Sequence, residues 1–249
     1  MMREETVFGP IFSRRLGSSL GINLLPRNGK VCNFDCIYCE CGWNKDGLGD
    51  RSLPTAADVR EALSAKLSEC AAAGTPIDSI TFSGDGEPTL NPEFPAIVDL
   101  TLELRDRYFP AAKVSVLSNA TMAYKDDVFR ALSRVDNPIL KLDAPANELV
   151  ALVNRPVGHY HVEEVVRSLE RFDGQFVLQT MFLKAPEFRS GDWVSDWMAV
   201  VRRVHPREIM VYTIDRETPM KGLEKYTVEE MRALVQPLID EGYNIQIKG

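Results

Sequence analysis

The chain has 249 residues, of which 45% are hydrophobic and 26% are charged, and its formal net charge is −7. That length and composition suit one sizeable globular domain, because barrels of alternating strands and helices commonly reach this size undivided. The acidic balance disfavours nonspecific nucleic-acid binding. Since neither an apolar signal region nor a run of about eighteen apolar residues occurs, we expect a cytoplasmic protein with no membrane segment.

Short β-rich runs alternate with helical patterns along the chain, which is typical of βα units around a parallel sheet. After a first strand, a long loop is predicted to run to about Arg51, and the first helix is predicted from Thr55 to Gly74, with Asp58 completing a capping box. Strands are predicted at 20–25, 77–82, 113–117, 139–142, 175–183, 208–214 and 244–248, and further helices at 93–107, 162–172, 192–204 and 228–241. Six such units predict the α/β class and a partial (β/α)6 barrel, as a single domain 1–249 with an N-terminal extension, 1–19.

Four of the five cysteines fall within ten residues of the long loop. Cys32, Cys36 and Cys39 have the spacing C-x3-C-x2-C, which lets three thiolates converge on one face of a cubane iron-sulfur cluster and leaves the fourth iron without a protein ligand. An open iron can bind a substrate or cofactor. The fifth cysteine, Cys70, lies on the apolar stripe of the first predicted helix and is expected to be a small buried hydrophobic residue.

Three other interpretations of the loop remain open. Structural zinc is one, although zinc sites usually combine two separated C-x2-C pairs or Cys/His sets, and no histidine lies near the loop. Disulfides are another, but the sequence shows no secretory signal. A thioredoxin-like pair would use the C-x2-C spacing of Cys36 and Cys39, and would leave Cys32 unexplained.

With Tyr38 directly before the last cysteine, the C-x3-C-x2-C loop resembles the signature of the radical S-adenosylmethionine (SAM) enzymes. In that superfamily the open iron holds the amino and carboxylate groups of SAM. An electron from the cluster then splits SAM into methionine and a 5′-deoxyadenosyl radical, which abstracts hydrogen from a substrate. The resemblance implies a [4Fe-4S] cluster on Cys32, Cys36 and Cys39, and an electron donor such as flavodoxin or ferredoxin. Cys41 is expected not to ligate when SAM is bound, since a fourth cysteine would block SAM.

A second motif follows one βα unit later, at Gly84-Asp85-Gly86-Glu87. Glycines let a backbone come close to a ligand, and a glutamate accepts hydrogen bonds from an ammonium group. On its own the segment would be a plain βα turn. After the cysteine loop, it resembles the superfamily's glycine-glycine-glutamate motif, which holds the amino group of SAM, although Asp85 separates the two glycines.

Polar residues at the ends of later strands complete the expected SAM site. Ser118, Asn119 and Asp143 lie where relatives bind the ribose or carboxylate of SAM, and the alternative for Asn119 and Asp143 is helix N-capping. Lys141 and Asp143 are expected to face the barrel interior, opposite Leu140 and Leu142. Together the resemblance implies these contacts to SAM: Tyr38, Gly84, Asp85, Gly86, Glu87, Ser118, Asn119 and Asp143. The fifth predicted strand places Gln179 and Met181 on one face, which assigns Gln179 to the same pocket. Arg155 is a further candidate for a SAM or substrate carboxylate.

Within the superfamily, the segments 14–17, 19–23, 36–40 and 83–89 look similar to the iron-sulfur oxidoreductases related to the wyosine tRNA-base enzymes. Those relatives carry extra cysteines near the N-terminus, whereas none precedes Cys32, so nucleic acid is not expected as a partner. A basic cleft at Arg14, Arg15, Arg27 and Lys30 would nevertheless suit phosphates.

Three alternatives remain. One is a radical SAM enzyme that modifies a tRNA base, and another is a glycyl-radical enzyme activase, whose substrate is a protein loop. The third, of a different class, is a metal-binding interaction protein. No cysteine follows Cys70, so no auxiliary-cluster domain is expected. The substrate itself cannot be read from the residues.

Overall fold

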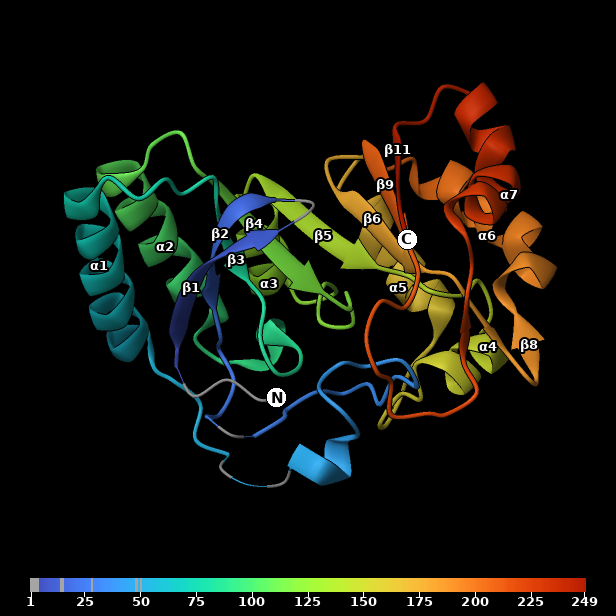
Figure 1. Ribbon diagram of the computed structural model, residues 1–249, viewed down its shortest axis with the longest axis horizontal. Helices are drawn as coiled ribbons and strands as arrows, with labels where there is room; N and C mark the ends of the chain where they lie inside the picture. The colour runs from blue at the N-terminus through green and yellow to red at the C-terminus, as the bar shows by residue number, and fades with distance from the viewer. Residues whose placement is uncertain (1–4, 14–15, 28, 48, 50) are drawn as a thin grey trace. The chain divides into compact units, whose positions relative to one another are not determined.

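The computed structural model describes residues 5–13, 16–27, 29–47, 49 and 51–249 (Figure 1). The chain divides into two compact units. The first comprises the described parts of Met1–Cys32, Asn44–Ser118 and Lys125–Pro138, and the second comprises Asn33–Trp43, Asn119–Tyr124 and Ile139–Gly249. The boundary falls inside the cysteine loop, directly after Cys32.

In the described part of the first unit the strands lie in the order β1-β2-β3-β4, with β1 antiparallel to β2 and the remaining neighbours parallel. Its elements are β1 (Val7–Ser13), β2 (Gly17–Ile22), β3 (Ser79–Phe82), β4 (Lys113–Ser118), α1 (Ala56–Ala73), α2 (Phe94–Tyr108), α3 (Asp126–Leu132) and the 3-10 turns η1 (Asn44–Gly47) and η2 (Pro88–Leu90). Figure 1 shows α1 and α2 side by side, and Arg60 on α1 pairs with Glu103 on α2 at 2.9 Å.

Helix α1 forms as the sequence indicates. The Thr55 hydroxyl oxygen accepts a hydrogen bond from the Asp58 N–H, and the Asp58 carboxylate accepts one from the Thr55 N–H, which satisfies two otherwise unpaired backbone donors at the start of the helix. The helix ends at Gly74, whose φ of 66° suits a residue without a β-carbon. Cys70 is 3% exposed on the buried face, so its prediction as a core residue is confirmed.

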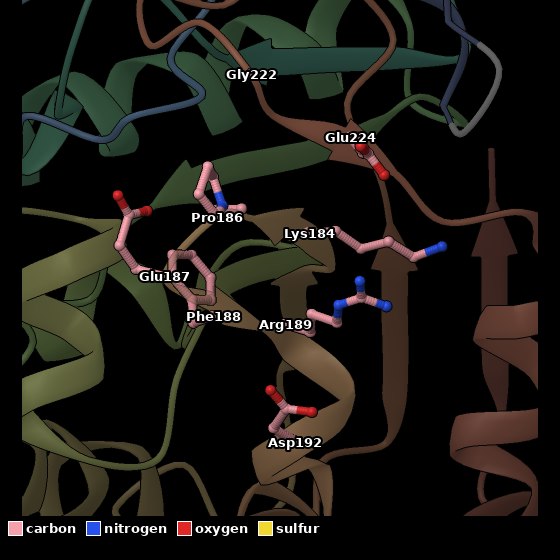
Figure 2. Close-up of a pocket in the computed structure, with 9 residues that line it drawn as sticks. Lys184, Pro186, Glu187, Phe188, Arg189, Asp192, Gly222 and Glu224 are labelled. Atoms are coloured by element: carbon pink, nitrogen blue, oxygen red, sulfur yellow. The ribbon is translucent and has the colours of Figure 1, made fainter.

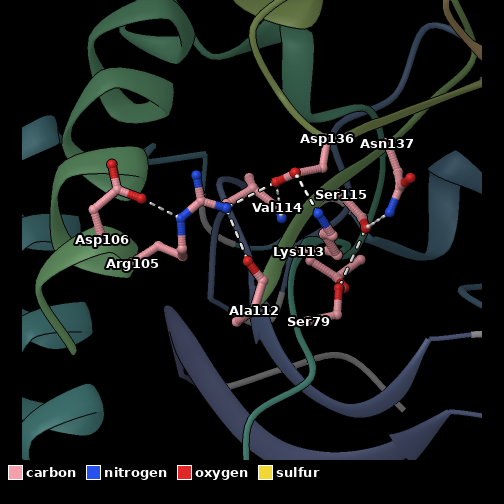
Figure 3. Close-up of polar contacts among 10 residues, drawn as sticks. Ser79, Arg105, Asp106, Ala112, Lys113, Val114, Ser115, Asp136 and Asn137 are labelled. Atoms are coloured by element: carbon pink, nitrogen blue, oxygen red, sulfur yellow. Dashed lines mark hydrogen bonds and ion pairs between the residues drawn. The ribbon is translucent and has the colours of Figure 1, made fainter. Parts of the chain in front are cut away.

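Asp136 links α2 to β4 by hydrogen bonds within the first unit (Figure 3). Its carboxylate accepts hydrogen bonds from the Val114 N–H (2.9 Å), Arg105 Nη1 (2.8 Å) and Lys113 Nζ (3.2 Å). Burial by itself would raise the pKa of Asp136, but these hydrogen bonds outweigh it and hold the pKa below its ordinary value. Asp136 is therefore ionised at neutral pH and stabilises this part of the fold.

The second unit carries parallel strands in the order β5-β6-β9-β11 and a small antiparallel sheet in the order β10-β7-β8. Its strands are β5 (Asn137–Lys141, whose first two residues belong to the first unit), β6 (Val177–Met181), β7 (Leu183–Ala185), β8 (Phe188–Arg189), β9 (Glu208–Tyr212), β10 (Glu224–Lys225) and β11 (Ile245–Lys248). Its helices are α4 (Asn147–Val153), α5 (Val162–Glu170), α6 (Val194–Val204), α7 (Val228–Asp240) and the 3-10 turn η3 (Ser190–Trp193).

The α/β class and the mostly parallel pairing of strands are confirmed. The first predicted strand, 20–25, is shifted, because β2 spans Gly17–Ile22 and pairs with an unpredicted antiparallel strand, β1. The sequence also did not predict α3, α4 or the small sheet. Helices of seven residues and strands of two or three are too short to show a period. No helix among the described residues has both the length and the apolar character needed to cross a membrane.

Candidate functional site

The second-unit part of the cysteine loop is a pair of successive turns. The Cys39 N–H donates to the Cys36 carbonyl (3.1 Å), and the Gly42 N–H donates to the Cys39 carbonyl (3.0 Å). Gly42 has a φ of 77°, which a residue with a β-carbon rarely adopts. Like Cys32, which lies in the first unit, Cys36 and Cys39 are half-buried residues that form no disulfide.

A backbone ladder holds the start of this loop against the segment that follows α4. The two stretches, 33–37 and 153–157, exchange hydrogen bonds in antiparallel fashion, and Phe34 forms a bridge with Pro156. The bonds run from Asp35 N to Asn154 O (2.8 Å), from Ile37 N to Val153 O (3.0 Å) and from Val157 N to Asn33 O (2.8 Å). The loop containing Cys36 is therefore positioned by residues more than a hundred positions away in sequence.

Tyr38, the aromatic residue of the motif, belongs to a buried polar cluster in the second unit. Its hydroxyl donates to Asp143 Oδ2 and accepts from Lys141 Nζ at 3.1 Å. Lys141 also donates to the Tyr212 hydroxyl, lies 3.8 Å from Asp143 Oδ1, and sits 5.0 Å from the ring centroids of both tyrosines. Asn154 Nδ2 donates to Asp143 Oδ2 (2.7 Å). The expected shared face of Lys141 and Asp143 is confirmed, with Leu140 and Leu142 buried.

The protonation states in this cluster follow from its charges. Burial alone would lower the pKa of Lys141, but Asp143 and Tyr212 outweigh burial and raise it above its ordinary value. Burial, reinforced by the Asp143 carboxylate, raises the pKa of Tyr38 well above its ordinary value. Lys141 is thus an ammonium ion and Tyr38 a neutral phenol at physiological pH. Burial also raises the pKa of Cys36 to about 11.

Asp143 uses both of its carboxylate oxygens inside the protein. Oδ2 accepts from Tyr38 and Asn154, and Oδ1 accepts from the Met181 N–H at 2.9 Å. The alternative of helix N-capping is wrong for this residue, because the N-cap of α4 is Ala146 and receives no side-chain cap. In the structure, Asp143 binds the hydroxyl of Tyr38, the tyrosine of the cysteine motif. A contact between Asp143 and SAM stays a prediction.

In the first unit, the glycines of the Gly84–Glu87 segment fit against the chain itself. A β-carbon on Gly84 would lie 2.0 Å from Asn23 Oδ1, and one on Gly86 would lie 1.9 Å from the Val31 carbonyl oxygen. Val31 also pairs with the segment, donating its N–H to the Asp85 carbonyl (3.2 Å) and accepting from the Glu87 N–H (3.0 Å). The sequence explained the glycines by close approach of a ligand, whereas here they allow close approach of Asn23 and Val31.

Glu87, in the loop after β3, and Ser118, the last residue of β4, are brought together in the first unit. Ser118 Oγ donates to Glu87 Oε1 at 2.8 Å, and the same oxygen accepts from the Thr89 N–H at 3.1 Å, which caps η2. Both residues are at most 5% exposed. The structure thus orients the Glu87 carboxylate from two sides, and the cap is a role that the sequence did not indicate.

The remaining candidates of the second unit lie near the cysteine loop or the polar cluster. Asn119 donates through Nδ2 to Asn33 Oδ1 (2.8 Å) and accepts from the Thr121 N–H (3.1 Å). Its N-capping alternative is wrong, because the next helix, α3, has Lys125 as its N-cap. Gln179, 5% exposed, lies opposite Lys141 in the β5–β6 register.

The remaining charged candidates are Arg155 and the residues of the predicted basic cleft. Arg155 stacks its guanidinium 5.0 Å from the centre of the Trp43 ring and has a φ of 47°. Arg14 and Arg15 lie outside the described residues. Of the other two residues of the predicted basic cleft, Arg27 is exposed and Lys30 is 6% exposed, and contact of the cleft with phosphates stays a prediction. Asn154 and Tyr212 were not singled out from the sequence, because a single polar residue after a short helix or at a strand end carries no spacing signal.

A hollow lies elsewhere in the second unit, on the small sheet (Figure 2). It has a volume of about 280 Å³ and is lined by Lys184–Arg189, Asp192, Gly222 and Glu224. Lys184 is already paired with Glu230 at 2.8 Å. None of the residues predicted from the sequence lines this hollow.

Within the described residues, no three His, Cys, Asp or Glu side chains stand together as a metal site. The donor chemistry of the loop nevertheless fits an iron-sulfur cluster. All five cysteines are thiols, and Asn154 Nδ2 donates to Cys36 Sγ at 3.3 Å, the kind of hydrogen bond that cluster-bound sulfurs accept.

Comparison with known proteins points the same way. The family model described as the radical SAM superfamily matches residues 29–176, more than half of the chain. The chain is 29% identical over 219 residues to a UPF0026 protein of Helicobacter pylori, covering 87% of this chain and 68% of that protein. It is also 29% identical over 234 residues to the protein named GTPase Obg of Brachyspira hyodysenteriae, covering 92% of this chain but only 33% of that protein.

Solved structures of similar fold have low sequence identity to this chain. A radical SAM methyltransferase from Sphaerobacter thermophilus has a TM-score of 0.69 at 16% identity, covering 92% of this chain and 65% of that one. SuiB from Streptococcus suis, bound to S-adenosylmethionine, has a TM-score of 0.66 at 16% identity, covering 91% of this chain and 50% of that one. TYW1 with a lysine-pyruvate adduct has a TM-score of 0.64 at 13% identity, covering 92% and 76%. The mostly parallel α/β fold is thus the fold of these enzymes.

Proposed function

The chain belongs to the radical SAM superfamily, and from that premise we propose that it is an enzyme that cleaves S-adenosylmethionine reductively. The products are methionine and a 5′-deoxyadenosyl radical that abstracts hydrogen from a substrate. The observation that best supports the proposal is the length of chain that the family model matches. Residues 29–176 include the three cysteines, the Gly84–Glu87 segment, Ser118, Asn119 and Asp143.

Cys32, Cys36 and Cys39 would hold a [4Fe-4S] cluster through their thiolates. When bound, the cluster supplies the electron that breaks the sulfonium bond of SAM and an open iron for the amino and carboxylate groups. The chain supports this ligation with the ladder between 33–37 and 153–157, which fixes the backbone before Cys36, and with the turns at Cys39 and Gly42. Cys41 stays outside the ligand set of the SAM-bound protein.

The SAM contacts form the second part of the proposal. Glu87, oriented by Ser118 and Thr89, would accept hydrogen bonds from the SAM amino group. The other proposed contacts are Tyr38, Gly84, Asp85, Gly86, Ser118, Asn119, Asp143 and Gln179. Of these, Tyr38 and Asp143 are hydrogen-bonded to each other, so they would contact SAM as a hydrogen-bonded pair. A low-potential donor such as flavodoxin or ferredoxin, and a cytoplasmic location, belong to the same proposal.

Anaerobic reconstitution tests the function directly. We expect four irons and four sulfides per chain, and 5′-deoxyadenosine formed from SAM under dithionite. A chain that binds zinc in preference, or that holds the cluster but releases no 5′-deoxyadenosine, would contradict the proposal. The matched control is Cys41→Ala, which removes a thiol of the same loop without removing a proposed ligand.

A further inference from the structure

The side chain of Asn154 touches one of the proposed cluster ligands. Its Nδ2 lies 3.3 Å from Cys36 Sγ, 3.2 Å from the Tyr38 hydroxyl and 2.7 Å from Asp143 Oδ2. Asn154 is 2% exposed and is the C-cap of α4, where its backbone N–H donates to the Val150 carbonyl at 2.7 Å. Any residue could make that backbone contact. The buried amide therefore serves the three side chains and not the helix end.

The hydrogen bond to Asp143 determines which end of the Asn154 amide faces Cys36 Sγ. Both oxygens of Asp143 accept hydrogen bonds, Oδ1 from the Met181 N–H and Oδ2 from the Tyr38 hydroxyl, so the NH2 group of Asn154, and not its oxygen, points toward Asp143 Oδ2. Cys36 Sγ lies within reach of the same nitrogen. The amide is thus held with a donor, and not an acceptor, toward the proposed ligand.

The two hydrogens of Nδ2 have three acceptors to serve. The shortest contact, to Asp143, takes one of them. The Tyr38 oxygen already accepts a hydrogen from Lys141, and a ligand thiolate carries more negative charge than a neutral phenol, which makes it the stronger acceptor. The second hydrogen of Asn154 is therefore directed to Cys36 Sγ.

We propose that Asn154 is a positioning residue for the cluster, which holds Cys36 by an N–H···S hydrogen bond and raises the reduction potential of the metal centre. The inference rests on the proposed function. Reduction adds negative charge that is shared by the sulfur ligands, so a donor aimed at one of them stabilises the reduced form more than the oxidised form. An amide that only supported Tyr38 and Asp143 would leave the potential unchanged.

The test is an anaerobic redox titration of the reconstituted full chain, followed by electron paramagnetic resonance. Asn154→Ala removes the donor, Asn154→Leu removes it while keeping the volume, and Asn154→Gln keeps an amide on a longer arm. Asn147→Ala is the matched control, because Asn147 caps α5 through the Val162 N–H (2.8 Å) and forms no described bond to a cysteine.

At a fixed ambient potential we expect the ratio of reduced to oxidised cluster to fall about threefold to tenfold in Asn154→Ala and Asn154→Leu, tenfold corresponding to about 59 mV for a one-electron couple. Asn154→Gln should recover part of the loss, and Asn147→Ala should match the parent. Loss of iron from the Ala and Leu variants alone would also support the proposal, since the same contact holds the ligand.

Two results would overturn the inference, and they are distinguishable. If the parent and all variants hold the cluster and titrate at one potential, the role of Asn154 is wrong while the proposed function stands. If the parent takes up no iron after reconstitution, the proposed function fails and this inference fails with it.

Discussion

Gly86 and Val31 approach so closely that a β-carbon on the glycine would lie 1.9 Å from the valine carbonyl oxygen. Their contact is part of a parallel bridge, and Val31 directly precedes Cys32. Backbone contacts with Val31 therefore hold the Gly84–Glu87 segment beside the start of the three-cysteine motif. Substitution of Gly86 tests how much this contact contributes to stability.

Gly86→Ala should destabilise the folded chain by about 2 kcal/mol or more, because the clash involves backbone that cannot rotate away and Gly86 also has a φ of 142°. Urea unfolding measures the change. Gly242→Ala is the control, since Gly242 also has a positive φ, 92°, but has nothing within 4 Å of the added carbon. The control should cost about 1 kcal/mol. Equal effects of the two substitutions would contradict the argument.

Substitution of the cysteines should divide them into two groups. Cys32→Ala, Cys36→Ala and Cys39→Ala should each abolish reductive cleavage of SAM, because each removes one of three protein ligands. Cys41→Ala and Cys70→Ala should leave cleavage largely intact, the latter because Cys70 is buried on α1. Iron content and 5′-deoxyadenosine formation measure this. Loss of the cluster in Cys41→Ala, with retention in one of the other three, would reverse the assignment.

Asp136 should contribute to acid sensitivity. Its folded-state pKa lies below the ordinary value of 3.8, so its stabilising contribution is fully present above about pH 4 and is lost as the pH falls through the lowered folded-state pKa. Asp136→Asn should therefore cost about 1–2 kcal/mol at pH 7, and the difference from the parent should shrink as the pH falls through the lowered folded-state pKa.

Unfolding at several pH values measures the Asp136 effect, and Asp106→Asn is its control. Asp106 also pairs with Arg105, at 2.6 Å, but its side chain is 65% exposed. Such a pair contributes about 0.5 kcal/mol or less. A variant of Asp136 that keeps the parent's full stability at pH 7 would show that the contacts in Figure 3 do not hold the fold.

Arg155 combines a strained backbone with a cation stacked on Trp43. Arg155→Ala loses the stacking, worth about 0.5–1 kcal/mol, and keeps the positive φ. Arg155→Gly loses the stacking but relieves the backbone, so it should be more stable than the alanine variant by about 1 kcal/mol. Urea unfolding of the pair measures this. If Arg155 also binds a carboxylate of SAM, both variants should lose the same SAM affinity in calorimetry, whatever their stability.

The sequence by itself determined the chemistry that the chain offers. Three cysteines at C-x3-C-x2-C spacing with Tyr38 inside the motif are a local pattern, and local patterns are visible without a fold. The alternation around Leu140 and Leu142 also predicted that Lys141 and Asp143 share a face, because strand side chains alternate with a period of two. The capping box of α1 was equally local, since its two partners lie three residues apart.

Only the tertiary structure decided what those side chains contact. Asn154 lies 118 residues beyond Cys36 in sequence and Asp143 lies 105 beyond Tyr38, and no spacing rule connects residues so far apart. The structure also changed the explanation of Gly84 and Gly86. They allow close approach of Asn23 and Val31, which come from other parts of the chain. Residue types and short spacings fix which chemistry is possible, whereas long-range packing fixes which donor meets which acceptor.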